Sequence, residues 1–172
     1  WLYFNIHGLD YDTPPYSQKP SEQKKTFLKI HNQIIRFAGK KNLSSFVRLH
    51  YYSESFELKN FYKQKNIYGL FVTDREVGSY RLPKKNSNEL ILKGITKFKG
   101  VYFIRTDYRV EFLSKIKNTS TIKKNFNDNF KKNRKIIIYT HENELKKKIN
   151  VTNLINSMKI LVNDLSILNA KP

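Results

Sequence analysis

The hydrophobic residues of this chain alternate between short apolar runs and longer segments with helical spacing. The apolar runs predict β-strands at residues 2–6, 46–49, 67–73 and 134–139. Apolar positions recurring every three or four residues predict helices at 21–38, 56–65, 119–132 and 151–162. Because strands alternate with helices and the strand runs are almost continuously apolar, the pattern indicates βαβ units with a parallel sheet buried on both faces.

Between residues 78 and 111 the helical period is absent. Two short β-like runs, 90–95 and 101–106, are interrupted by Pro83, Gly94 and Gly100. We therefore expect a β-hairpin insertion followed by a further strand. No fixed-length repeat and no convincing boundary divides the 172 residues, which favours a single domain.

Composition excludes several classes of protein. With 39% hydrophobic residues the chain can bury a core, so it is not expected to be disordered. It has no cysteine, which excludes a disulfide framework, a thiolate nucleophile and a sulfur-ligated zinc site. No apolar run approaches the roughly 18 residues of a membrane span. No signal-peptide pattern is present either, so the expected location is cytoplasmic or unassigned.

The net charge is +19, from 33 basic and 14 acidic residues. Such a charge raises affinity for phosphates, and a nucleic-acid-binding module is one hypothesis. However, the excess is mainly lysine and accompanies many Asn and Ile residues, as A/T-rich coding DNA would produce. The lysines also fall on predicted helices and turns, so nucleic acid is not the expected partner.

Three of the four histidines, His7, His50 and His141, follow predicted strands directly. Carboxyl ends of parallel strands share one edge of a sheet, where ligands bind. Charged side chains lie at or near the same strand ends: Asp10, Arg48, Asp74, Arg75, Arg105, Asp107 and Glu142. Imidazole and carboxylate groups gathered there predict a divalent-metal site, the alternative being that each histidine binds a neighbouring loop. The fourth, His31, is predicted to lie partly buried on a helix.

Several segments resemble polysaccharide-deacetylase-like proteins over residues 1–145, closest to a poorly characterised branch. They are Trp1-Leu2-Tyr3-Phe4-Asn5-Ile6-His7-Gly8-Leu9-Asp10, Ile34-Ile35-Arg36-Phe37-Ala38-Gly39, Arg48-Leu49-His50-Tyr51-Tyr52-Ser53, Gly69-Leu70-Phe71-Val72-Thr73-Asp74-Arg75, Arg105-Thr106-Asp107-Tyr108-Arg109 and Tyr139-Thr140-His141-Glu142. The resemblance implies an α/β fold of parallel βα units forming an incomplete, irregular (β/α)7-type barrel. It also implies removal of acetyl groups from a glycan, at amide or ester bonds, with acetylated oligo- or polysaccharide as partner.

The same resemblance implies roles for individual residues. His141, Asp74 and Glu142 are the expected catalytic residues, with His141 protonating the leaving group. His7 and His50 are the expected ligands of a divalent metal, expected to be zinc. The substrate-binding residues implied are Asp10, Arg48, Tyr51, Arg75, Arg105 and Asp107.

Two departures from the family pattern affect the expected activity. The strand that ends in paired aspartates has no counterpart, and Tyr11 stands where a second metal-binding histidine is usual. We therefore expect residues 1–172 to be the C-terminal part of such a barrel. The alternative is an inactive relative that binds saccharide or supports surface-polysaccharide biosynthesis.

Overall fold

The computed structural model describes residues 3–7, 19–48, 56–72, 82–113, 116, 118–141 and 144–163. The chain divides into two compact units, Trp1–Arg105 and Thr106–Pro172, and each is described by itself. None of the helices in these described ranges is long and apolar enough to cross a membrane.

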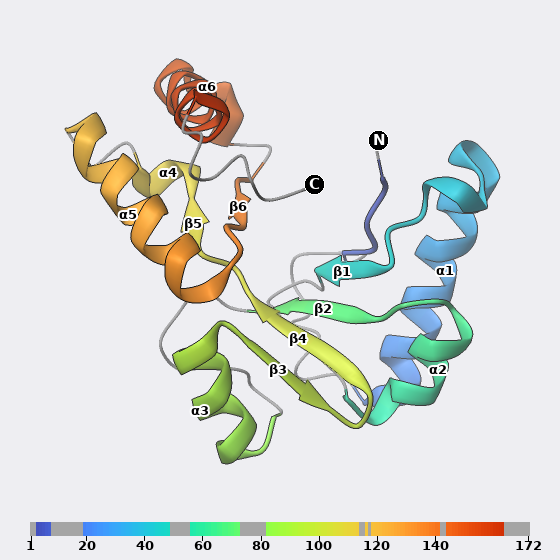
Figure 1. Ribbon diagram of the computed structural model, residues 1–172. Helices are drawn as coiled ribbons and strands as arrows, with labels where there is room; N and C mark the ends of the chain where they lie inside the picture. The colour runs from blue at the N-terminus through green and yellow to red at the C-terminus, as the bar shows by residue number, and fades with distance from the viewer. Residues whose placement is uncertain are drawn as a thin grey trace. The chain divides into compact units, whose positions relative to one another are not determined.

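The first unit contains a four-stranded sheet in the order β1-β2-β4-β3 (Figure 1). Its strands are β1 (Phe46–Arg48), β2 (Gly69–Val72), β3 (Ile95–Phe98) and β4 (Val101–Arg105). β1, β2 and β4 are parallel, and β3 pairs with β4 as an antiparallel hairpin. The predicted α/β class, the parallel strands and the hairpin are confirmed.

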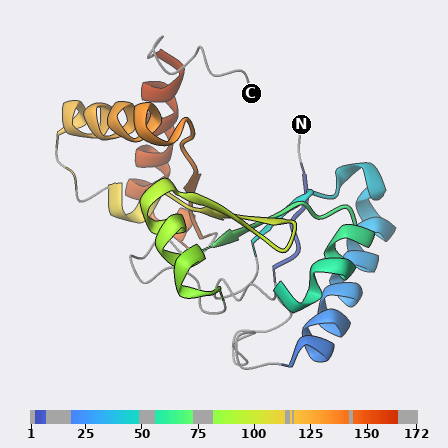
Figure 2. The same ribbon diagram turned by 60° about the horizontal axis from the view of Figure 1, so that its bottom comes forward.

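Helices precede or separate the parallel strands. They are α1 (Pro20–Ala38), the 3-10 turns η2 (Lys40–Asn42) and η4 (Phe56–Leu58), α2 (Lys59–Gln64) and α3 (Lys84–Lys93). α1 ends at Gly39, whose φ of 81° suits glycine because a side chain is disfavoured there. α1 and α2 lie side by side in both views (Figures 1 and 2).

One prediction in this unit is wrong. Residues 90–93 belong to α3 and are not β-like, because Leu90 is the fully buried position of that helix. Gly94 follows in the left-handed conformation, with φ of 70°, and its amide bonds to the Leu90 carbonyl. The glycine therefore ends a helix, whereas the sequence pattern suggested that it interrupts a strand.

All three helices pack on one face of the sheet. Val47, Leu70 and Phe103 form a row of register partners on that face and are almost fully buried. Side chains from α1, α2 and α3 join the same core: Phe27, Ile34, Phe61, Tyr62 and Leu90. Parallel strands in sequential order, with helices on one side, are the arrangement of a singly wound α/β sheet.

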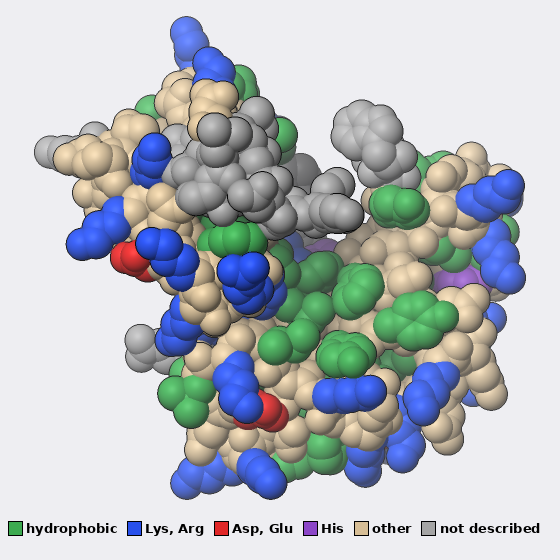
Figure 3. All heavy atoms as spheres, in the orientation of Figure 1, with side chains coloured by type: hydrophobic (Ala, Val, Ile, Leu, Met, Phe, Trp, Pro, Cys, Tyr) green, Lys and Arg blue, Asp and Glu red, His purple; other side chains and the backbone are tan. Residues whose placement is uncertain are grey.

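The opposite face of the sheet is partly open. Phe46, Gly69 and Tyr102 form its neighbouring row, and Phe46 and Tyr102 are 38% and 39% exposed. In Figure 3 hydrophobic side chains gather over β1, β2 and β4. The expectation of a sheet buried on both faces is therefore wrong at these two aromatic residues.

The second unit is built around two short parallel strands, β5 (Tyr108–Arg109) and β6 (Ile138–Tyr139). The other elements are α4 (Val110–Leu113), α5 (Thr119–Asn133), the 3-10 turn η5 (Glu144–Lys146) and α6 (Lys148–Asn163). Leu113 and Phe126 form the buried centre, with Tyr108 and Ile122 packed against it. The predicted strand at 134–139 is shorter than expected, because Arg134 ends α5 with a φ of 54°.

The described strands thus form one four-stranded and one two-stranded sheet, and they do not form a closed barrel. The predicted first strand, residues 2–6, is present as a single parallel bridge between Phe4 and Leu43. The coarse expectation, parallel βα units with a hairpin, is confirmed by the first unit.

Candidate functional site

The parallel pair β5–β6 brings two side chains of the second unit together. Arg109 lies opposite Tyr139, and Glu111 and His141 each follow two residues later. Nδ1 of His141 lies 2.8 Å from Oε1 of Glu111. Because the carboxyl ends of parallel strands meet at one edge of a sheet, this topology produces a histidine–carboxylate pair.

The pair is partly shielded from solvent. The Glu111 side chain is 14% exposed and that of His141 is 35% exposed. The ring of Tyr139 meets the imidazole edge to face, with centroids 5.9 Å apart. The Arg109 guanidinium lies over the rings of Tyr139 and Phe112, so this arginine packs beside the pair as a cation on aromatic faces.

This geometry fixes the imidazole. A neutral His141 that donates Nδ1–H to the carboxylate carries its lone pair on Nε2. The carboxylate also stabilises the imidazolium that forms when Nε2 takes up a proton. The pair is therefore chemically suited to proton transfer at Nε2, with Glu111 orienting the ring.

A second carboxylate lies in the field of the same imidazole. Lys147 donates a hydrogen bond of 2.7 Å to Oε2 of Glu144, and this contact is the main cause that lowers the pKa of Glu144. The amide of buried Asn150 and the charge of His141 lower it further. Glu144 is thus held as a carboxylate near the pair.

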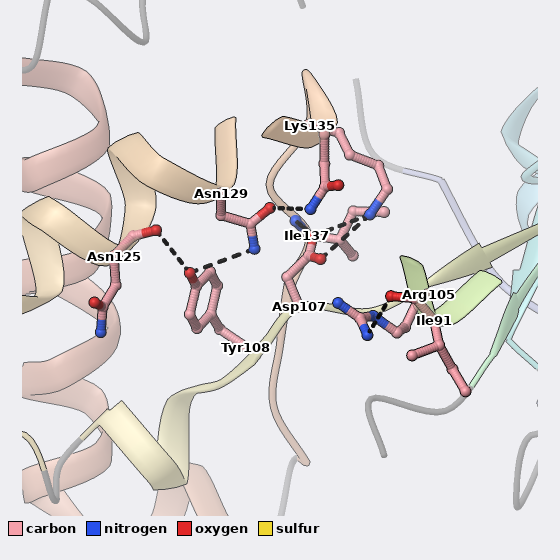
Figure 4. Close-up of polar contacts among 9 residues, drawn as sticks. Ile91, Arg105, Asp107, Tyr108, Asn125, Asn129, Lys135 and Ile137 are labelled. Carbon is pink, nitrogen blue, oxygen red and sulfur yellow. Dashed lines mark hydrogen bonds and ion pairs between the residues drawn. The ribbon is translucent and has the colours of Figure 1, made fainter. Parts of the chain in front are cut away.

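Asp107, an expected substrate-binding residue, is held inside the second unit (Figure 4). Its carboxylate is fully buried and accepts bonds from Nζ of Lys135 at 3.1 and 3.3 Å. The amide of Ile137 donates a further bond of 2.9 Å to Oδ2. These contacts tie the segment before β5 to the segment before β6, while the substrate-binding role stays a prediction.

Arg105 ends β4 in the first unit, and its Nη1 donates to the carbonyl of Ile91 in α3 at 3.1 Å (Figure 4). Arg48 ends β1 at the same edge of the sheet. In the register Arg48 lies beside Phe71, on the open face, whereas Arg105 lies beside Val72, on the helix-covered face. The structure therefore places the two arginines at one edge but on opposite faces.

His7 is fixed against the end of β1. Its Nδ1 lies 2.8 Å from the carbonyl oxygen of Arg48. Asn5 contacts the same strand through its side chain: Nδ2 donates to the Phe46 carbonyl at 3.2 Å, and Oδ1 accepts from the Arg48 amide at 3.1 Å. The side-chain amide of Asn5 thus makes the two hydrogen bonds with β1 that a peptide group of a neighbouring strand would make. Metal-binding histidines are commonly oriented by such a carbonyl contact.

Six expected site residues lie outside the described residues: Asp10, His50, Tyr51, Asp74, Arg75 and Glu142. Among the residues that are described, no group of three or more His, Asp or Glu side chains could hold a metal ion. The metal site therefore stays a prediction, with His7 and His50 as its expected ligands and His50 outside the described residues. His31 lies on a helix as expected and is buried, with its ring stacked on Phe27.

Sequence reasoning missed Glu111. The rule that it used, a polar residue after an apolar strand, also applies to this glutamate, which follows β5 by two positions. The apolar pattern predicts a strand at 101–106, and this strand places Asp107, not Glu111, at its end. A second short strand at 108–109 was the missing signal.

No family model, no curated protein and no solved structure matches this chain. The similarity to polysaccharide deacetylases therefore stays a prediction from the sequence.

Proposed function

We propose that this chain is a hydrolase that removes acetyl groups from an acetylated glycan. The observation that carries the proposal is the His141–Glu111 pair, 2.8 Å between Nδ1 and Oε1, at the carboxyl ends of two parallel strands. An imidazole that a carboxylate orients is a suitable general acid and base for acyl transfer.

In this proposal His141 donates a proton from Nε2 to the leaving nitrogen or oxygen of the sugar. Glu111 is a positioning residue, because it acts through the imidazole and stabilises its charged form. The small distance between Nδ1 and Oε1 holds the ring in one orientation before substrate binds, which lowers the entropic cost of the proton transfer.

The proposed fold is an incomplete (β/α)7-type barrel. Two features of the first unit support it. The parallel strands β1, β2 and β4 are neighbours in the sheet and follow one another in chain order, and helices pack on one face. In such a barrel the opposite face, with Phe46 and Tyr102, would line the interior.

A zinc ion, if bound, would be held by His7 and His50 and would polarise the acetyl carbonyl. The contact of His7 Nδ1 with the Arg48 carbonyl agrees with a ligand role for this histidine. The described donors do not complete a site, so we derive no step through the metal.

The test is acetate release from acetylated chitooligosaccharides and acetylated xylan, measured with and without added Zn²⁺. We expect His141→Ala to lower turnover by about 10²-fold or more, as loss of a general acid does. Glu111→Gln should lower turnover less, because the imidazole loses the carboxylate that orients it but keeps its acid group. Glu144→Gln is the matched control, since it neutralises a nearby glutamate that has no assigned part in the reaction. Absence of acetate release, or equal effects of Glu111→Gln and Glu144→Gln, would reject the proposal.

A second candidate is saccharide binding without hydrolysis. The observation that favours it is the open sheet face, where the rings of Phe46 and Tyr102 are partly exposed and Nζ of Lys97 lies over the Tyr102 ring. Aromatic faces beside polar groups suit sugar stacking. Binding of the oligosaccharides without acetate release, abolished by Tyr102→Ala and kept by His141→Ala, would support this candidate over the first.

A further inference from the structure

The first unit has a pocket of about 600 Å³ at the opposite end of its strands from the expected site. Ser44 and Ser45 lead directly into β1, and Lys65 and Asn66 precede β2. These residues, with Lys40 and Lys41 from η2, line the pocket. Because β1 and β2 are parallel, the pocket lies beside their amino ends. Its volume is within the usual range for small-molecule sites.

The charge of the pocket has one sign. Three lysines line it, and no aspartate or glutamate does. Among the described residues, Lys40, Lys41 and Lys65 form no ion pair and no side-chain hydrogen bond. On the face shown in Figure 3, lysine and arginine side chains gather over α1 and α2 without a visible acidic side chain. Ammonium groups brought together without counter-charges attract an anion.

The remaining lining is also polar. His31 contributes from α1, although it is only 7% exposed, and its Nδ1 lies 3.2 Å from Oδ1 of Asn32, which also lines the pocket. Oδ1 of Asn32 can only accept, so in this arrangement Nδ1–H donates and Nε2 carries the lone pair. If the oxygen and nitrogen of the Asn32 side chain are exchanged, Nδ1 accepts and Nε2 is a donor. The hydroxyl of Ser45 and the amide of Asn66 add donors to the same lining, whereas the Ser44 hydroxyl already donates to the Phe46 carbonyl at 2.6 Å.

We propose that this pocket binds a small phosphorylated molecule. A phosphate group offers several oxygens to ammonium, hydroxyl and amide donors at once, which matches three lysines, Ser45 and Asn66 around one cavity. The cavity is larger than one phosphate, so a diphosphate, or a phosphate joined to a sugar or nucleoside, fits the volume. The site belongs to a different end of the first unit from His7 and does not depend on the proposed hydrolase.

The experiment is calorimetric titration of the full chain with inorganic pyrophosphate and with ADP, repeated at about 50 and about 200 mM salt. Lys65→Gln, and the double variant Lys40→Gln/Lys41→Gln, should each weaken binding by about tenfold or more, the usual cost of one lost charge-assisted contact. Thermal melting checks that the variants fold. Lys131→Gln/Lys132→Gln is the matched control, since it removes two adjacent exposed charges from α5 in the other unit.

The proposal is supported if the pocket variants lose affinity and the control keeps it. Equal losses of affinity in both double variants would show that pyrophosphate binding depends only on the net charge of +19. That result would overturn the proposal. Absence of measurable heat with both probes at the lower salt concentration would also overturn it. Stronger binding of ADP than of pyrophosphate would assign the ligand to the nucleoside phosphates.

Discussion

Nδ1 of His141 and Oε1 of Glu111 lie 2.8 Å apart, although 30 residues separate them in the chain. The contact exists because β5 and β6 are parallel and each residue follows its strand by the same two positions. A shift of one residue in the register of these strands would separate the two side chains. The contact between the two side chains therefore depends on the pairing of β5 with β6. It is also the candidate for proton transfer described above.

The first prediction concerns the strength of this pair. We expect a double-mutant cycle of Glu111→Gln and His141→Gln, measured by urea unfolding, to give a coupling free energy of about 1 kcal/mol. The reason is that Glu111 is largely buried, so solvent screens the interaction only in part. The cycle for Lys147 and Glu144, whose lysine side chain is 62% exposed, should give a smaller coupling free energy, because solvent screens this pair more strongly. Equal coupling in the two cycles would contradict the prediction.

The second prediction concerns Asp107. Removing one partner of a buried ion pair leaves an uncompensated charge or polar group, so we expect Asp107→Ala to lower the free energy of unfolding by about 3 kcal/mol. It also leaves Lys135 and the Ile137 amide without the buried carboxylate that accepts their bonds. Asp128→Ala, at an exposed position of α5, should change stability by less than about 0.5 kcal/mol. Chemical denaturation of both variants measures the difference; similar losses would refute a structural role for Asp107.

The third prediction concerns Asn5. Its amide donates to one backbone group of β1 and accepts from another, so Asn5→Ala should destabilise the chain by about 1 kcal/mol. Asn5→Asp should cost at least as much, because a carboxylate oxygen then faces the Phe46 carbonyl. Asn60→Ala, at an exposed position of α2, is the control. Hydrogen exchange at the Arg48 amide should accelerate in Asn5→Ala, which removes the oxygen that accepts from this amide. Unchanged exchange in that variant would show that this contact is not formed in solution.

The sequence predicts the elements whose pattern is local and strong. The spacing of Phe27 and Ile34, together with Gly39, predicts α1, and these residues form its buried face and its end. α3 was missed because only Leu90 is buried, so one apolar position could not establish a helical period.

The candidate site was only partly predictable for a related reason. The strand-end rule identified His141 directly, since the residue follows an apolar run. Its partner Glu111 follows a strand of only two residues, which has no detectable pattern of its own. The contacts of His7 and Asn5 depend on how the N-terminal segment lies along β1, and that is a tertiary property.

The fourth prediction uses the pH dependence of stability. Contacts with Lys147 and Asn150 lower the pKa of Glu144 below its ordinary value of 4.5 in the folded chain. A carboxyl group with a lowered folded pKa stabilises the protein above its unfolded pKa, and that contribution is lost as the pH falls through the folded pKa. The free energy of unfolding should therefore fall more steeply below about pH 4.5 for the original chain than for Glu144→Gln. Lys147→Gln should reduce the steepness as well, because it removes the largest cause of the lowered pKa. Parallel pH curves for the three proteins, measured by urea unfolding, would show that these contacts do not form in solution.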